Sequence, residues 1–74
     1  MKTYLKIMFN SEGVPPSEIK DSLLNMGFEA TKGNYDFVYD WANNVTKVDE
    51  LVFFADKVHA ALKNNNVYFN IETL

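Results

Sequence analysis

Apolar and polar residues alternate at both ends of the chain with the two-residue period of a β-strand. Near the N-terminus the alternation covers residues 2–10, and it returns over residues 66–74. This period places every second side chain on the same face of a sheet. We therefore predict a first strand that ends near Asn10 and a last strand over 66–74. The inward-facing residues are Thr3, Leu5, Ile7 and Phe9 in the first strand, and Val67, Phe69 and Ile71 in the last.

Two segments between these strands follow the helical period instead. The first begins at Pro15-Pro16, where the fixed φ of proline suits a helix start, and ends near Met26. Gly27 then fits the left-handed position that ends many helices. The apolar side of this predicted helix over 16–26 carries Ile19, Leu23 and Met26.

The second helical segment follows a loop at 43–46. Thr46 and Asp49 have the spacing of a capping box, so the helix is predicted to begin at Thr46 and to end at the asparagine run 64–66. Phe53 and Ala60 point away from its apolar face. That face holds Val48, Leu51, Phe54, Ala55, Val58 and Leu62, with Val52 and His59 on its flank.

A β-hairpin is predicted between the two helices, with strands at 28–31 and 35–41 joined by Lys32-Gly33-Asn34. In its second strand, Asp36, Val38 and Asp40 alternate with aromatic residues. Burying carboxylates beneath helices is costly, so we expect the two aspartates to face outward and the aromatic row to face the helices. The aromatic row consists of Tyr35, Phe37, Tyr39 and Trp41.

The resulting element order, β-α-β-β-α-β, is that of the ferredoxin-like split unit. The sequence thus predicts a single α+β domain over 1–74, built as a four-stranded antiparallel sheet in the order 4-1-3-2 with two helices packed on one face. This order makes the first and third strands neighbours, and it places lysines opposite aspartates on the outer face. The outward residues are Lys2, Tyr4 and Lys6 in one strand and Asp36, Val38 and Asp40 in the other.

The composition argues against several classes of function. The chain of 74 residues has ten acidic residues against seven lysines, no arginine and a net charge of −3, which disfavours binding to nucleic acid. The absence of cysteine excludes disulfides, thiolate nucleophiles and cysteine-ligated metals. No metal site or cofactor is predicted. No apolar run approaches the roughly 18 residues of a membrane span, so we expect a cytoplasmic protein without membrane contact.

The turn between the first strand and the first helix resembles that of ACT regulatory domains. These domains have a similar length and the same element order, and they often carry an acidic or amide residue and then glycine at this turn, before a helix that ends in glycine; here Asn10, Gly13, Val14 and Gly27 match. The resemblance implies that an amino acid or a similar small anion binds between this turn and a partner subunit. Backbone N–H groups and a helix N-terminus suit such a ligand, although Pro15-Pro16 departs from the family pattern and removes two N–H groups. The implied ligand-binding residues are Asn10, Ser11, Gly13 and Val14.

The sequence gives less support to a catalytic or an RNA-binding function. Acylphosphatases share the predicted topology but need an arginine, and heavy-metal-associated domains need a CxxC pair; both features are missing. RNA-recognition motifs expose aromatic residues on the sheet, which here would bury Asp36 and Asp40. His59 has Asp56 within helical reach but no nucleophile or further metal ligand, so we assign it to the helix flank. We predict no enzymatic activity.

Apolar side chains outside the predicted core indicate a protein partner. Phe53 lies on the solvent side of the second helix, and the last strand is a sheet edge with neither proline nor lysine to block pairing. The sequence favours a small non-enzymatic interaction or regulatory module that acts through a homodimer or another protein. The alternative is an ACT-like sensor of an amino acid or small anion. The predicted partner interface consists of Phe53, Tyr4, Val38 and Tyr68.

Overall fold

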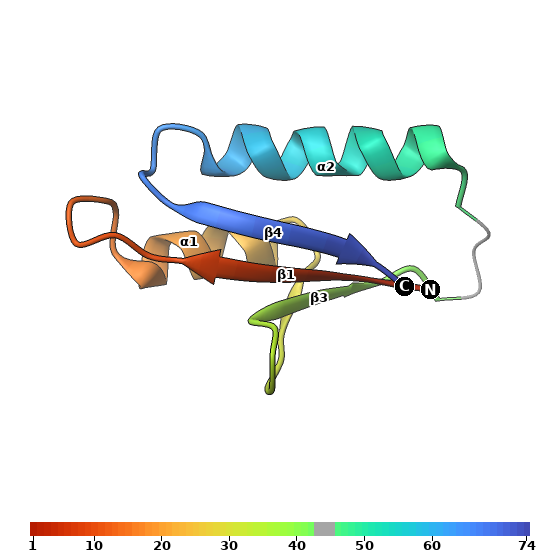
Figure 1. The fold of residues 1–74 in the computed structure, drawn as a ribbon, viewed down its shortest axis with the longest axis horizontal. Coiled ribbons are helices and arrows are strands. Elements are labelled where there is room, and N and C mark those ends of the chain that lie inside the picture. The colour runs from red at the N-terminus through yellow and green to blue at the C-terminus, as the bar shows by residue number, and fades with distance from the viewer. Residues whose placement is uncertain (43–45) are drawn as a thin grey trace.

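The computed structural model describes residues 1–42 and 46–74, and in this part the elements follow the predicted order (Figure 1). The loop predicted at 43–46 therefore falls largely outside the described residues, since 43–45 are not among them. The elements are β1 (Lys2–Met8), α1 (Pro16–Asn25), β2 (Glu29–Ala30), β3 (Phe37–Asp40), α2 (Val48–Leu62) and β4 (Tyr68–Thr73).

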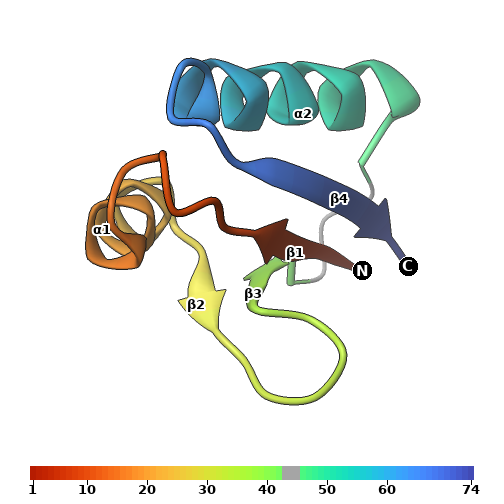
Figure 2. The same cartoon turned by 60° about the vertical axis from the view of Figure 1, so that its left-hand side comes forward.

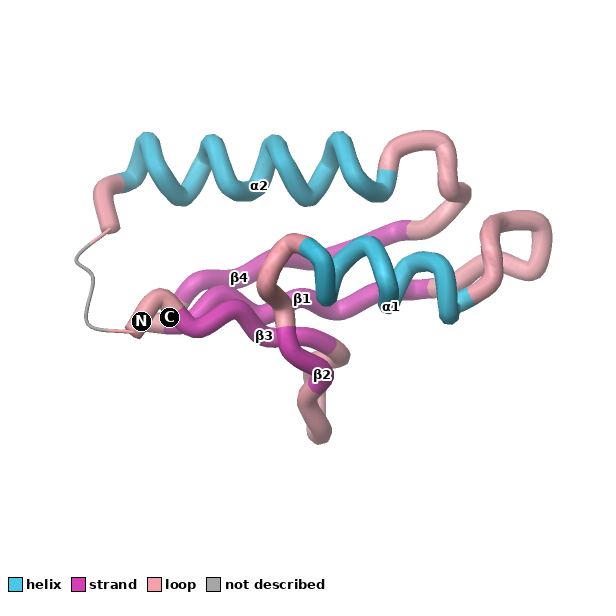
Figure 3. Tube along the Cα trace, turned by 180° about the vertical axis from the view of Figure 1, so that it is seen from behind, coloured by secondary structure: helices cyan, strands magenta, loops and turns pink. Residues whose placement is uncertain are grey.

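The four strands form one antiparallel sheet in the order β2-β3-β1-β4. This is the predicted order 4-1-3-2 read from the opposite edge. Both helices lie on the same face of the sheet, as the views in Figure 2 and Figure 3 show. The two chain ends meet at one end of the sheet, where Lys2 and Leu74 exchange backbone hydrogen bonds of 3.0 and 2.9 Å (Figure 1). The predicted α+β architecture is confirmed.

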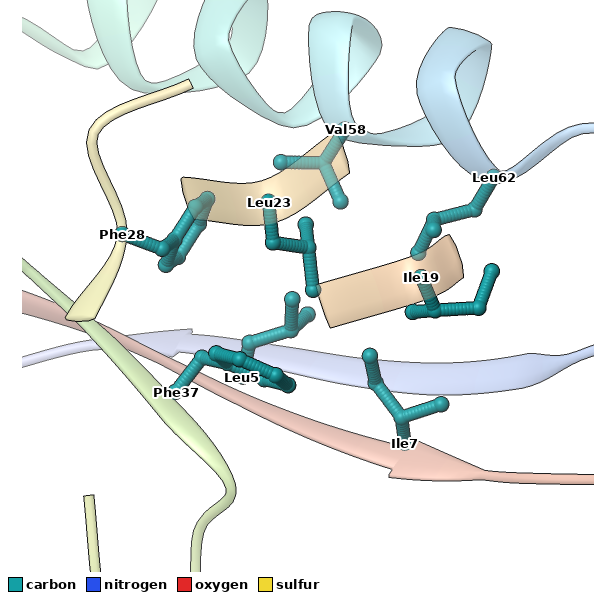
Figure 4. Close-up of a cluster of buried hydrophobic side chains, with 8 residues drawn as sticks. All are labelled: Leu5, Ile7, Ile19, Leu23, Phe28, Phe37, Val58 and Leu62. Atoms are coloured by element: carbon teal, nitrogen blue, oxygen red, sulfur yellow. The ribbon is translucent and has the colours of Figure 1, made fainter. Parts of the chain in front are cut away.

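The hydrophobic core fills the space between the sheet and the helices. Leu5 of β1, Leu23 of α1 and Val58 of α2 are completely buried and converge in its middle (Figure 4). Burial of an apolar side chain of this size contributes about 1.5 to 3 kcal/mol to stability, so these three residues hold the sheet and the two helices together. The full set of buried apolar residues is Leu5, Ile7, Ile19, Leu23, Phe28, Phe37, Val58 and Leu62.

A buried threonine lies at the edge of this core. The Thr3 hydroxyl is 2.8 Å from the Thr73 hydroxyl and accepts the indole N–H of Trp41 at 2.7 Å. Its polar atom therefore has partners although the residue is only 1% exposed. The contacts join β1, β4 and the residue that follows β3.

The end of α1 forms as the sequence predicts. Gly27 has φ 100°, its N–H donates to the Leu24 carbonyl at 3.0 Å, and the Phe28 N–H donates to the Leu23 carbonyl at 3.1 Å. These two bonds define a Schellman motif, which satisfies the last carbonyls of the helix and turns the chain. The turn delivers Phe28 into the core, where it is buried.

The predicted start of the second helix is wrong. The N-cap residue of α2 is Lys47, no side chain caps the helix, and the Thr46 hydroxyl makes no hydrogen bond in the described structure. Val48 is the first residue of the helix, and it is 73% exposed instead of facing the core as predicted. The predicted helix end is confirmed, because Asn64 adopts a left-handed φ of 68° just after the helix.

The first strand and the hairpin each depart from the prediction at one residue. β1 ends at Met8, and Phe9 is exposed instead of facing inward. Phe37 and Tyr39 face the helices as predicted, but Tyr35 lies on the open face of the sheet, where its ring centroid is 4.9 Å from that of Tyr4.

Asp36 causes the change in the position of Tyr35. The Leu5 carbonyl accepts the Asp36 N–H at 2.9 Å although Leu5 is paired with Phe37, so two residues face one, as in a β-bulge. The Asp36 carboxylate then accepts the Ile7 N–H at 2.8 Å, in place of a main-chain carbonyl. Because the extra residue reverses the alternation of faces, Tyr35 moves to the open face and the Asp36 carboxylate is directed at the Ile7 N–H of β1 instead of outward.

Candidate functional site

The outer edge of β4 is the longest open edge of the sheet. β4 pairs with β1 on one side and with no strand of the described chain on the other, whereas the opposite edge is formed by the two residues of β2. β4 contains no proline, no lysine and no positively charged group that would oppose pairing with a further strand. This edge is therefore the part of the sheet best suited to add a strand.

Hydrogen bonds to β1 fix which groups of β4 face that edge. Leu74 donates to and accepts from Lys2, and the ladder continues through the pairs Tyr4 with Glu72 and Lys6 with Asn70. In an antiparallel ladder the bonding direction alternates along the strand. The N–H and C=O groups of Phe69, Ile71 and Thr73 consequently point away from β1.

One flank of α2 carries exposed apolar residues. Val48 and Val52 are 73% and 54% exposed, and Val52 lies one turn after Val48. Ala55 and His59 continue the same helical stripe by their spacing. His59 lines a hollow together with Tyr68 and Phe69, so this flank lies on the β4 side of the helix. We call these four residues the α2 flank.

The residues predicted for the partner interface lie in three places. Tyr4 and Val38 are paired across β1 and β3 on the open face, and both are half-buried. Tyr68 lies at the start of β4 and is 71% exposed. Phe53 lies on α2, on the helix side of the sheet. The structure does not bring the four together into one patch.

A tyrosine from the hairpin covers part of the open face. The Tyr35 hydroxyl donates to the Glu72 carboxylate of β4, and its ring packs on Tyr4 of β1. The hydrogen bond to Glu72, with a smaller effect of desolvation, raises the pKa of the Tyr35 phenol above its ordinary value. The hairpin is thereby tied across the sheet to its edge strand.

The turn predicted to bind a small anion uses several of its backbone donors internally. The Gly13 N–H donates to the Asn10 carbonyl at 2.9 Å, and the Glu12 N–H donates to the Asn10 side chain at 2.9 Å. The Val14 N–H donates to the Asn65 carbonyl at 3.3 Å. Gly13 also lies so close to the loop after α2 that a Cβ atom would be 2.5 Å from the Asn65 oxygen. Binding of an amino acid at Asn10, Ser11, Gly13 and Val14 remains a prediction.

A cleft beside α2 was not predicted from the sequence. It measures about 740 Å³ and lies between the end of α1 and the first half of α2, with Tyr39 and Trp41 beneath it. The aromatic residues themselves were visible in the sequence, but the cleft depends on α1 being five residues shorter than α2. Its lining residues are Asn25, Met26, Tyr39, Trp41, Asp49, Glu50, Phe53, Phe54 and Lys57.

Other candidate chemistry is sparse among residues 1–42 and 46–74. His59 is exposed on the α2 flank, and no cluster of three or more histidine, aspartate or glutamate side chains suited to a metal ion occurs in that part. Neither described helix has the length and apolarity needed to cross a membrane.

Comparison of the chain with models of protein families, with curated proteins and with solved structures finds no significant match to any of them. The edge of β4, the α2 flank and the cleft are the surface features of the described chain that point to a function.

Proposed function

We propose that the chain is a protein-interaction module that forms a homodimer through the edges of two β4 strands. The observation that carries this proposal is the free row of main-chain groups at Phe69, Ile71 and Thr73. Two such edges related by a twofold axis would join two sheets into one, with all helices on the same face. Such pairing covers an edge that otherwise invites uncontrolled association.

The outward groups favour one register of the two strands. A twofold axis at Asn70 places Phe69 of one copy opposite Ile71 of the other, and both residues direct their main-chain groups outward. The same register places Tyr68 opposite Glu72, so the two Glu72 carboxylates do not face each other. Asn70 of one chain faces Asn70 of the other as a non-hydrogen-bonded pair, the kind of pair in which opposing side chains approach most closely.

The α2 flank supports the same arrangement independently. Val48 and Val52 are exposed and do not pack in the core, and they lie on the side of the helix above β4. Joining two sheets at β4 brings the α2 helices of both copies next to each other in antiparallel orientation. Apolar contact along this flank would bury residues that are exposed in the single chain, and Ala55 is small enough to allow close approach.

An amino-acid or anion sensor at the β1 to α1 turn receives less support. The donors of Glu12, Gly13 and Val14 already have acceptors within the chain, and Pro15 and Pro16 have no N–H group. A ligand would have to displace these bonds or use the few donors that are left. For this reason we favour the interaction module over the sensor.

Charge substitutions at Asn70 test the homodimer and its register. Asn70→Glu would place two carboxylates face to face in the dimer, yet within one chain the new side chain lies opposite Lys6, which favours folding. Asn70→Lys opposes two ammonium groups in the dimer, and its new side chain also lies opposite Lys6 of its own chain, so circular dichroism must show that this variant is folded. Sedimentation velocity should show a dimer for the native chain, monomers for each variant alone, and a restored dimer when the two variants are mixed.

The matched control is Asn34→Glu, which makes the same chemical change at an exposed residue of the hairpin turn. It should leave the dimer unchanged. A native chain that stays monomeric at submillimolar concentration would overturn the homodimer. A dimer that persists in both Asn70 variants would place the interface elsewhere.

A further inference from the structure

The cleft beside α2 combines aromatic walls with carboxylates at its mouth. Tyr39, Trp41 and Phe54 are half-buried and pack edge to face or tilted, with ring centroids 4.6 to 5.0 Å apart. Asp49 and Glu50 line the same cleft from the first turn of α2 and are exposed. The interior wall is therefore aromatic, and the entrance is acidic.

The shape of this wall is fixed by contacts around it. The Trp41 indole N–H donates to the Thr3 hydroxyl at 2.7 Å, which holds the indole ring in place. Tyr39 packs so closely on the α1 end that a Cβ atom at Gly27 would lie 2.9 Å from its ring. Rings that are held in this way do not need to be ordered when a ligand binds, which lowers the entropic cost of binding.

One aromatic ring of this cleft lies next to a cation. The Lys57 ammonium already lies 5.1 Å from the centre of the Phe53 ring, and both residues line the cleft. Aromatic faces attract organic cations electrostatically, most strongly for tryptophan, and nearby carboxylates add to the attraction. The net charge of −3 acts in the same direction at longer range.

We propose that this cleft binds a small organic cation of the alkylammonium class, with its apolar body against Trp41 and Tyr39 and its charge near Asp49 and Glu50. The volume of about 740 Å³ lies within the range of small-molecule sites, roughly 300 to 1,000 Å³. The site lies on the α1 side of α2, away from the β4 edge, so it is independent of the proposed dimer.

Trp41 is the single tryptophan of the chain and lines the cleft, so its fluorescence reports on binding directly. The probe is choline, titrated at constant ionic strength. Its control is the neutral analogue in which carbon replaces the charged nitrogen, because this molecule has the same shape without the charge. Choline should give a saturable change in fluorescence, and the neutral analogue should bind at least about tenfold more weakly, a difference of about 1.4 kcal/mol.

The carboxylates are tested with a charge-matched pair of double variants. Asp49→Asn with Glu50→Gln removes both acidic groups of the cleft and should weaken choline binding about tenfold. Glu12→Gln with Glu18→Gln makes the same change in net charge near the opposite end of α1 and should leave binding unchanged. Circular dichroism establishes that each variant is folded.

Chemical shifts of the Glu50 and Phe53 amides provide a second readout that does not depend on the indole. No saturable response at millimolar choline in either measurement would overturn the site. Equal binding of choline and its neutral analogue would overturn the cationic ligand class, and undiminished binding by the carboxylate variant would overturn the role of Asp49 and Glu50.

Discussion

Gly27 and Gly33 have similar backbone angles but different surroundings. Alanine at the two positions therefore separates the cost of backbone strain from the cost of a steric clash. Gly27 has φ 100° and Gly33 has φ 97°, so alanine at either position adopts an unfavourable left-handed conformation. A Cβ atom at Gly27 would also lie 2.9 Å from the Tyr39 ring, whereas nothing lies within 4 Å of one at Gly33.

Gly33→Ala should therefore lower the free energy of unfolding by about 1 to 2 kcal/mol, the backbone cost alone. Gly27→Ala should cost about 1 to 3 kcal/mol more, because the Tyr39 ring must move within a packed aromatic cluster. Urea unfolding of both variants measures the difference. Equal losses of stability would mean that the ring moves away at no cost.

The contact between Tyr35 and Glu72 gives a second prediction at the scale of single residues. Because the hydrogen bond raises the pKa of Tyr35 in the folded chain, its contribution is complete below the ordinary pKa of tyrosine and is lost as pH rises through the raised value. Ultraviolet titration of tyrosinate should show one step at unusually alkaline pH. Tyr35→Phe should remove that step and Glu72→Gln should move it to lower pH.

Glu29→Gln is the control for this titration, since Glu29 is a carboxylate of β2 that is paired with Val38. It should leave the alkaline step in place. A titration that Glu72→Gln does not alter would show that the contact is absent in solution.

At the scale of the elements, the Asp36 carboxylate takes the part of a main-chain acceptor for β1. Asp36→Ala leaves the Ile7 N–H without this partner and should lower the free energy of unfolding by about 1 to 3 kcal/mol. Asp36→Asn keeps a side-chain oxygen and should cost less. Amide hydrogen exchange of Ile7 should accelerate strongly in the alanine variant and little in the asparagine variant; equal rates in all three proteins would contradict this assignment.

The same bulge shows where sequence patterns stop being informative about elements. The end of α1 was predictable, because Gly27 and the apolar spacing before it act locally. The position of Tyr35 was not, because a side chain that replaces a main-chain acceptor leaves the alternating pattern of the sequence intact. The start of α2 was predicted wrongly because Thr46 is a residue type that often caps helices, but it makes no capping hydrogen bond here.

For the whole molecule, the order of the elements and the right-handed crossovers through the two helices leave few topologies, and the strand order follows from them. Which strand forms the open edge was therefore visible in the sequence. The cleft was not, because it depends on how far α2 extends beyond α1 and on the packing of Tyr39, Trp41 and Phe54. The α2 flank became recognisable only once Val48 was found exposed.

The homodimer and the cation site use opposite sides of α2, so they can be tested separately. Val52→Glu places a charge on the α2 flank at a residue that is 54% exposed, so the single chain should remain folded. We expect this variant to dissociate the dimer at least about tenfold more readily and to bind choline as the native chain does. Sedimentation velocity and fluorescence titration measure the two effects, and a parallel loss of both would contradict their independence.

Amide hydrogen exchange along β4, measured at high and low protein concentration, tests the proposed homodimer most directly. In a single chain the Asn70 and Glu72 amides point to β1, whereas those of Phe69, Ile71 and Thr73 point to the open edge. Pairing of the β4 strands about Asn70 predicts that the Phe69 and Ile71 amides are protected at high concentration and exchange rapidly on dilution, while Asn70 and Glu72 stay protected throughout. Rapid exchange of Phe69 and Ile71 at every concentration would contradict the pairing of β4 strands.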